Sequence, residues 1–164
     1  MSPKPETRSP KQKSADRLLA DNRKASHDYH FLEMFEAGVA LLGTEVKSIR
    51  EGRVNLRDSY ALIDRGEVFL ENVHISAYSH KGYADHNPLR RRKLLLHREE
   101  IRKLVGRVSE KGLTLVPVRM YLKHGRVKIA LALAKGKQTH DKRETIKRRE
   151  IDRETRAAVK EGKR

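Results

Sequence analysis

The chain has 164 residues, of which 37% are apolar and 37% charged, with a formal net charge of +16 and no cysteine. This length supports one hydrophobic core, and the lack of cysteine excludes disulfides, cysteine-ligated zinc and thiol catalysis. So large a positive charge favours a polyanionic partner, with nucleic acid the first candidate. Without an apolar run of about 20 residues or an apolar signal segment, we expect a cytoplasmic protein and no membrane partner.

The charge is concentrated at the two ends of the sequence. Residues 1–24 carry +4 and residues 135–164 carry +6, so the ends hold 10 of the 16 excess charges. The first segment contains three prolines and almost no apolar residues, which predicts a flexible basic arm over 1–24. The last segment has helix formers without a wide apolar stripe. We therefore expect a folded unit over 25–134 and a basic tail over 135–164 that is disordered alone and helical when bound.

The first half of the folded unit has the pattern of short strands around one helix. Aromatic residues predict a strand over 29–35, with a bend at Gly38. A helix is expected over 44–50, capped by Thr44. Two apolar runs, 59–63 and 68–70, flank Gly66 and predict a hairpin, and a further strand is expected over 73–78.

The second half begins with a long basic loop over 79–93. Apolar residues at Ile101, Leu104, Val105 and Val108 then predict an amphipathic helix. The segments 113–122 and 126–133 predict a hairpin, and the second alternates in polarity. We expect a mainly β fold with two or three helices, an OB-fold-like antiparallel β-barrel of about six strands.

Several segments, taken in order, resemble small protein B, the SsrA-binding protein family of bacteria. The first are Asn22–Ala25 with His27–Tyr29, then Gly43–Arg50 and Asp58–Ala61. The others are Arg92–His97, then Gly112–Pro117, and finally Ala134–Lys137 running into His140–Arg143 as one motif. The similarity covers about residues 22–150, and six motifs in order are far more specific than any one of them.

The resemblance implies trans-translation, the rescue of stalled ribosomes. A family member binds the tRNA-like domain of transfer-messenger RNA (tmRNA, SsrA), promotes its alanylation and carries it to the ribosome. The implied partners are this RNA, the small-subunit decoding centre and mRNA channel, and, through the RNA, elongation factor Tu and alanyl-tRNA synthetase. The tail is expected to enter the empty mRNA channel as a helix.

Two sets of candidate residues follow from charge, position and resemblance. The RNA-binding set is Asn22, Arg23, Lys24, His27, Glu45, Lys47, Ser48, Arg50, Tyr83, Arg90, Arg91, Arg92, Lys93, Lys135 and Lys137. The decoding-centre and mRNA-channel set is Gly136, His140, Asp141, Lys142, Arg143, Lys147, Arg148, Arg149, Arg153 and Arg156. The basic side chains are suited to phosphate contacts, and Tyr83 to stacking on a base. The resemblance implies that His140 stacks in the decoding centre.

Alternatives remain open from the residues alone. Glu45 either accepts hydrogen bonds from an RNA base or is a carboxylate in the first turn of a helix. The eight histidines show no metal-ligand spacing and no catalytic arrangement, so we expect no enzymatic activity, metal or cofactor. A general single-strand or ribosomal RNA-binding OB-fold protein explains the charge and the barrel equally well, but not the ordered motifs.

Overall fold

The computed structural model describes residues 16–80, 85–110 and 112–161, with the backbone only at Thr139, His140 and Glu161. These ranges contain nine strands and four helices. In chain order they are β1 (Arg17–Asp21), α1 (Arg23–Asp28), β2 (Tyr29–Val39), α2 (Gly43–Arg50), β3 (Val54–Asn55), β4 (Tyr60–Asp64), β5 (Glu67–Glu71), β6 (His74–Ile75), β7 (Arg92–Leu95), α3 (Arg98–Val108), β8 (Leu113–Lys123), β9 (Arg126–Gly136) and α4 (Thr139–Glu161).

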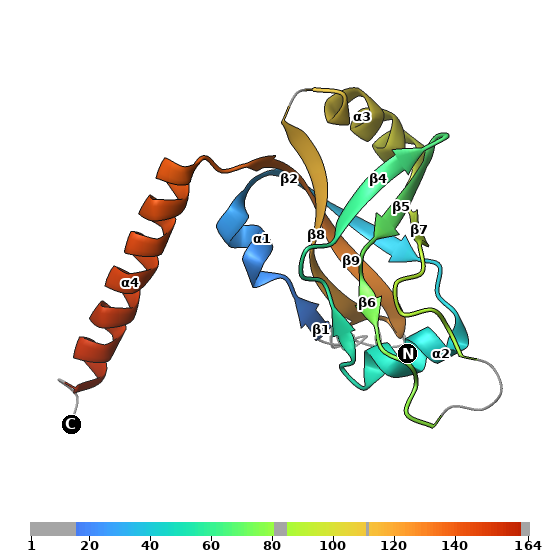
Figure 1. Cartoon of the computed structure of the whole chain (residues 1–164), viewed down its shortest axis with the longest axis horizontal. Helices are drawn as coiled ribbons and strands as arrows, with labels where there is room; N and C mark the ends of the chain where they lie inside the picture. The colour runs from blue at the N-terminus through green and yellow to red at the C-terminus, as the bar shows by residue number, and fades with distance from the viewer. Residues whose placement is uncertain (1–15, 81–84, 111, 162–164) are drawn as a thin grey trace, which may run out of the picture.

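Six antiparallel strands form a closed ring, shown in Figure 1. The order is β8-β4-β5-β7-β2-β9, and β9 pairs again with β8. Closure removes the open edges that a flat sheet of this size would expose. The predicted fold, mainly β with a closed antiparallel sheet of about six strands, is confirmed. β3 and β6 form a separate two-stranded sheet.

The two predicted hairpins have two-residue turns. Asp64 pairs with Glu67 across Arg65 and Gly66, and Lys123 pairs with Arg126 across His124 and Gly125. Both central residues of each turn have positive φ, between 50° and 76°. Such turns match the right-handed twist of the strands, and glycine in the second position adopts this φ without strain.

The ring encloses the main core, and a smaller cluster lies outside it under α1. Alternate residues of β9, from Val127 to Leu133, point into the ring as predicted. Ala134 belongs to the outer cluster with Ala25 and Val116, against which Tyr29 and Phe31 pack. Both faces of this end of β9 are therefore buried, which fixes α1 on the outside of the ring.

The predicted arm boundary at residue 24 is wrong. β1 pairs with β8 over Arg17–Asp21, and α1 follows it directly. The N-cap of α1 is Asn22, whose side-chain amide donates to Leu56 O at 3.0 Å and to Pro117 O at 2.9 Å. Backbone pairing, the buried Asn22 amide and the packing of Leu19 and Ala20 against the core hold this segment in place. Two apolar neighbours are too short a pattern to indicate a strand in the sequence.

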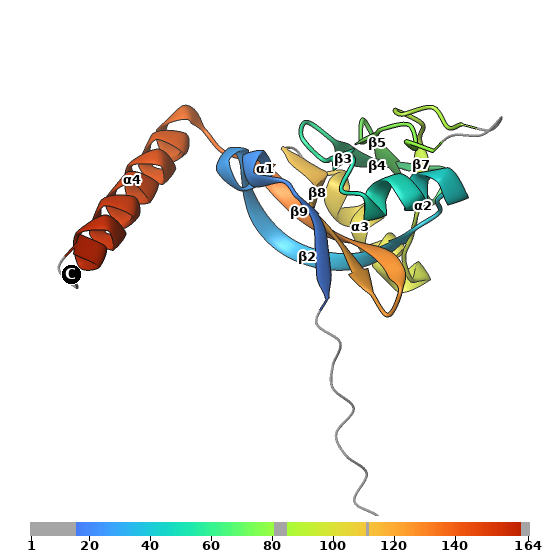
Figure 2. The ribbon, with the colours of Figure 1, turned by 90° about the horizontal axis from the view of Figure 1, so that it is seen from below.

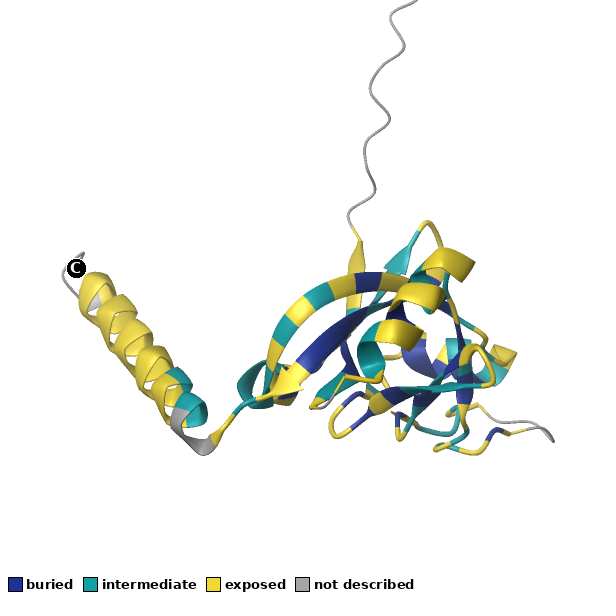
Figure 3. Ribbon diagram, turned by 90° about the horizontal axis from the view of Figure 1, so that it is seen from above, coloured by how far each residue is buried: buried dark blue, intermediate teal, exposed yellow. Residues whose placement is uncertain are grey.

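The segment predicted as the tail begins inside β9 and is mostly helical. β9 runs to Gly136, and Thr139–Glu161 form a 23-residue helix that projects from the ring beside α1 (Figures 1 and 2). Nearly all of α4 is solvent-exposed (Figure 3). Opposite charges at i and i+4, such as Glu144 with Arg148 and Asp152 with Arg156, favour a helix without tertiary packing.

Smaller differences concern three local predictions. α2 begins after Leu42, and its N-terminal backbone is capped by the Glu45 carboxylate, so Thr44 is not the cap. β2 does not end at Gly38 but continues to Val39, and both residues pair with β7. Of the strand predicted over 73–78, only His74–Ile75 pair with a neighbour.

Candidate nucleic-acid interface

One cationic region, the α1 surface, combines α1 with the end of β9. It consists of Arg23, Lys24, His27, Lys135 and Lys137. β2 and β9 pair through Tyr29 and Gly136, which places the start of one strand beside the end of the other. The side chain of Arg23 is 92% exposed and lies 3.7 Å from Asp21, and Lys24 forms an ion pair with Asp58. His27 Nδ1 lies 2.9 Å from Asp28 Oδ1. Of the predicted residues here, Asn22 is 4% exposed, and its side chain is occupied as the helix cap and by two backbone carbonyls.

A second cationic region, the α2 surface, lies at the other end of β1. Lys47 and Arg50 are exposed, and the Lys47 ammonium lies 5.3 Å from the centre of the Tyr78 ring. Arg17 Nη2 donates to Arg50 O at 3.4 Å, and Arg53 Nη1 donates to Ala77 O at 3.2 Å. These contacts add Arg17 and Arg53 to the region. The sequence pattern indicates neither residue, and Arg17 lies in the segment predicted to be a flexible arm.

α2 carries four of the predicted RNA-binding residues, and it places them on two different faces: Glu45 and Ser48 on one, Lys47 and Arg50 on the other. Helical geometry places positions three or four apart on one face. Glu45 and Ser48 therefore face inward with Ile49, all three without exposed surface, whereas Lys47 and Arg50 face solvent. The Ser48 hydroxyl has no hydrogen-bond partner among the described residues. The predicted RNA contacts of Glu45 and Ser48 are corrected, because neither side chain reaches the surface.

Glu45 instead anchors a buried ion-pair network. Its carboxylate accepts hydrogen bonds from Arg92 Nε at 2.8 Å and from Arg90 Nη2 at 2.8 Å. The Leu42 N–H donates to it at 2.8 Å. Burial raises the pKa of Glu45, but the bonds from Arg90, Leu42 and Arg92 outweigh burial, and the pKa lies below its ordinary value.

Arg92 is the other fully buried charge of this network. Its Nη1 donates to Val73 O at 2.7 Å and its Nη2 to Pro88 O at 3.1 Å. The side chain is 0% exposed, so the predicted RNA contact of Arg92 is corrected. Arg90 keeps about a third of its side chain exposed while it pairs with Glu45. The network ties α2, the segment before β7 and the start of β6 together.

The other two basic residues of this run are neutralised within the chain. Arg91 bridges Glu71 and Asp64 and lies 4.9 Å from the centre of the Phe69 ring. Lys93 Nζ lies 2.6 Å from Glu67 Oε1. Each cation already has a carboxylate partner, so an RNA phosphate at either would have to compete with it. Tyr83 lies outside the described residues.

The base of α4 rests on the α1 surface. The Lys137 N–H donates to Asp28 O at 2.8 Å, and Lys137 Nζ donates to Thr145 Oγ1 at 3.0 Å. Lys142 lies 3.8 Å from Asp28, and Asp141 lies 3.4 Å from His30 Nε2. Lys137 of the RNA-binding set therefore lies beside Asp141 and Lys142 of the ribosome set, at the base of α4. The backbone of His140 belongs to the first turn of this helix.

The other basic residues of the mRNA-channel set do not all lie on the same face of α4. Positions three, four or seven apart share one side of a helix, so Arg149, Arg153 and Arg156 lie together. The same side holds Lys142 and Lys160, and we call these five residues the α4 stripe. Lys147, Arg148 and Arg143 project from other faces of the helix.

The described residues offer neither a metal site nor a membrane-spanning segment. No three His, Asp or Glu side chains there are placed to hold a metal ion. In the same ranges, no helix is long and apolar enough to cross a membrane.

Comparison with known proteins assigns the family. The model of the family described as SmpB protein matches residues 19–161. The chain belongs to the SmpB family. A relative named SsrA-binding protein, from Syntrophobacter fumaroxidans, is 59% identical over 84% of this chain and 86% of the relative. Another of that name, from Trichodesmium erythraeum, is 57% identical over 92% and 97%.

A solved structure gives the same family. It is described as "tmRNA-SmpB: a journey to the center of the bacterial ribosome". The chain superimposes with a TM-score of 0.63 and 48% identity, covering 77% of this chain and 93% of the chain compared. The resemblance drawn from the motifs is therefore confirmed.

Proposed function

We propose that the chain binds the tRNA-like domain of tmRNA and acts in trans-translation. Membership of the SmpB family carries this proposal, because its relatives are named for binding SsrA. The exposed cations of the α1 and α2 surfaces support it, since RNA binding depends first on phosphate contacts. The RNA-contacting residues on this account are Arg23, Lys24, His27, Lys135 and Lys137 with Arg17, Lys47, Arg50 and Arg53.

The tail has a separate role in the proposal. α4 enters the empty mRNA channel of the small ribosomal subunit, with His140 and Gly136 at the decoding centre. The α4 stripe supports this, because five cations along one side of a 23-residue helix can follow a phosphate-lined wall. Lys147 and Arg148 lie off the stripe and contribute less to this contact.

Alanylation and delivery belong to the same proposal. The ring binds the tRNA-like domain of the RNA. The acceptor end of that domain stays free for alanyl-tRNA synthetase and elongation factor Tu. The chain therefore meets these two proteins through the RNA. All of these partners are cytoplasmic, and the chain acts in the cytoplasm without catalysing a step itself.

The test is peptide tagging in a reconstituted translation system with stalled ribosomes. Replacing Arg149, Arg153 and Arg156 by Glu is expected to abolish tagging while affinity for the tRNA-like domain stays within twofold. The control replaces Lys147, Arg148 and Arg143, which lie off the stripe, and is expected to retain most tagging. Equal loss in both variants would reject the stripe, and full tagging by both would reject channel insertion.

A further inference from the structure

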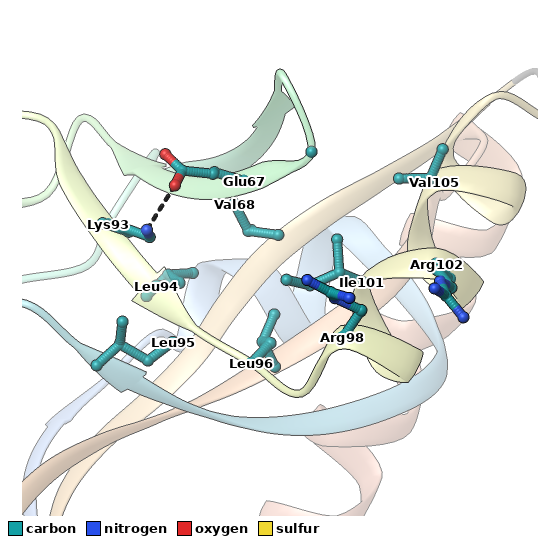
Figure 4. A pocket seen from close by; sticks show the side chains of 11 residues that line it. Glu67, Val68, Lys93, Leu94, Leu95, Leu96, Arg98, Ile101, Arg102 and Val105 are labelled. Carbon is teal, nitrogen blue, oxygen red and sulfur yellow. Dashed lines mark hydrogen bonds and ion pairs between the residues drawn. The ribbon is translucent and has the colours of Figure 1, made fainter.

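A solvent-open apolar groove lies between α3 and the strands β5 and β7, away from the surfaces described above. It encloses about 630 Å³, within the range of about 300–1,000 Å³ typical of ligand sites. Figure 4 shows Leu94, Leu96 and Ile101 lining it. Leu95 is 54% exposed and Val105 48% exposed. Apolar surface of this kind, on a chain so rich in charge, marks an interaction site.

Two uncompensated arginines border the groove. Arg98 and Arg102 stand one turn apart on α3, and neither has an ion-pair partner among the described residues. Their neighbours are all paired: Lys93 with Glu67, Lys103 with Glu33, and Arg107 with Glu110. Like charges at i and i+4 destabilise a helix slightly. Both guanidinium groups are therefore available to pair with a negatively charged group at the edge of the apolar groove.

The positive charge of the two arginines argues against another part of this chain, or a second copy, as the occupant of the groove. Residues 1–15 carry +3, and α4 is cationic, so neither complements the two arginines. A second copy would bring a further net charge of +16.

The composition of the floor argues against RNA. It consists of aliphatic side chains, without the aromatic rings on which bases stack. An occupant must supply both apolar side chains and negative charge, which a protein segment with carboxylates does.

We propose that this groove, between α3 and the β5–β7 pair, binds an acidic amphipathic helix of a partner protein. Leucine-like side chains of that helix cover Leu95, Ile101 and Val105, and flanking carboxylates pair with Arg98 and Arg102. α3 and α2 lie at opposite ends of the ring in Figure 1, so the partner can bind while the α2 surface stays free.

Methyl NMR of the full-length chain tests this with three designed helical peptides of equal length. One peptide places Leu at i, i+3 and i+7 with Glu elsewhere, a second replaces Glu by Lys, and a third replaces Leu by Ser. The acidic leucine peptide is expected to shift the methyl signals of Leu95, Leu96, Ile101 and Val105 saturably. The other two peptides are expected to bind at least tenfold more weakly.

Charge reversal supplies the second readout. Arg98→Glu with Arg102→Glu is expected to weaken the acidic peptide at least tenfold and to favour the lysine peptide. Arg57→Glu with Arg119→Glu, an equal change of charge elsewhere, is expected to change affinity less than twofold. Three results would overturn the proposal. The first is methyl shifts outside the groove, and the second is equal affinity for the acidic and lysine peptides. The third is tighter binding of a short single-stranded RNA at these methyl groups.

Discussion

Replacing Glu45 by Ala is expected to destabilise the fold strongly, and not to act through a lost RNA contact. The carboxylate has no exposed surface and holds Arg92, which is also fully buried. Removing Glu45 leaves the Arg92 guanidinium without a counter-charge in the interior, although it keeps its bonds to two backbone carbonyls. The same substitution removes the cap on the Leu42 N–H.

The magnitude follows from the loss of one partner of a buried ion pair. Such a loss costs about 3–5 kcal/mol. For a chain of this size, each kcal/mol shifts Tm by about 2–4 °C, so Tm is expected to fall by roughly 6–20 °C. Glu67→Ala is the matched control, because Glu67 also pairs with a basic residue of β7 but does so in solvent. An exposed pair contributes about 0–1 kcal/mol.

Urea unfolding followed by circular dichroism measures both variants, with affinity for the tRNA-like domain measured in parallel. At a temperature well below its Tm, folded Glu45→Ala is expected to bind the RNA within about threefold of the unchanged chain. A variant as stable as the unchanged chain that nevertheless binds RNA tenfold more weakly would refute the buried-anchor account.

Three further outcomes are expected. Asn22→Ala removes a helix cap and two buried hydrogen bonds, so urea should unfold this variant at a clearly lower concentration; an unchanged unfolding midpoint would contradict the role of Asn22. Folding lowers the pKa of Glu45, so its contribution to stability is present above about pH 4.5 and is lost as the pH falls through the folded value; unfolding free energies that stay constant from pH 6 to pH 3 would disagree. Arg23→Gln should reduce the salt dependence of RNA binding by about one phosphate contact, whereas Arg91→Gln should leave it unchanged, and the reverse order would count against the α1 surface.

Patterning predicted the elements that bury an apolar face. The hairpin turns at Gly66 and Gly125 and the alternation of β9 all appear in the structure. α3 also matches its predicted stripe, except that Val105 faces the open groove and not the core. These features depend on local periodicity, which the sequence displays directly.

The candidate site was less predictable, because exposure depends on contacts between distant residues. A basic run such as Arg90–Lys93 indicates phosphate binding, yet Arg92 is buried and Arg91 is paired with carboxylates of β4 and β5. The helical spacing of Glu45 and Ser48 was a usable signal, since positions 45, 48 and 49 share one face. A buried carboxylate is rare enough that periodicity alone did not favour it.

The separation of RNA binding from ribosome sensing is the central claim, and one competition measurement tests it. The chain cut after Gln138 retains the whole of β9 and the contact of the Lys137 N–H with Asp28. Both it and the full chain are expected to bind the tRNA-like domain with equal affinity, and at least tenfold more tightly than elongator tRNA at physiological salt. A tenfold loss of affinity on truncation, or equal affinity for the two RNAs, would contradict the account.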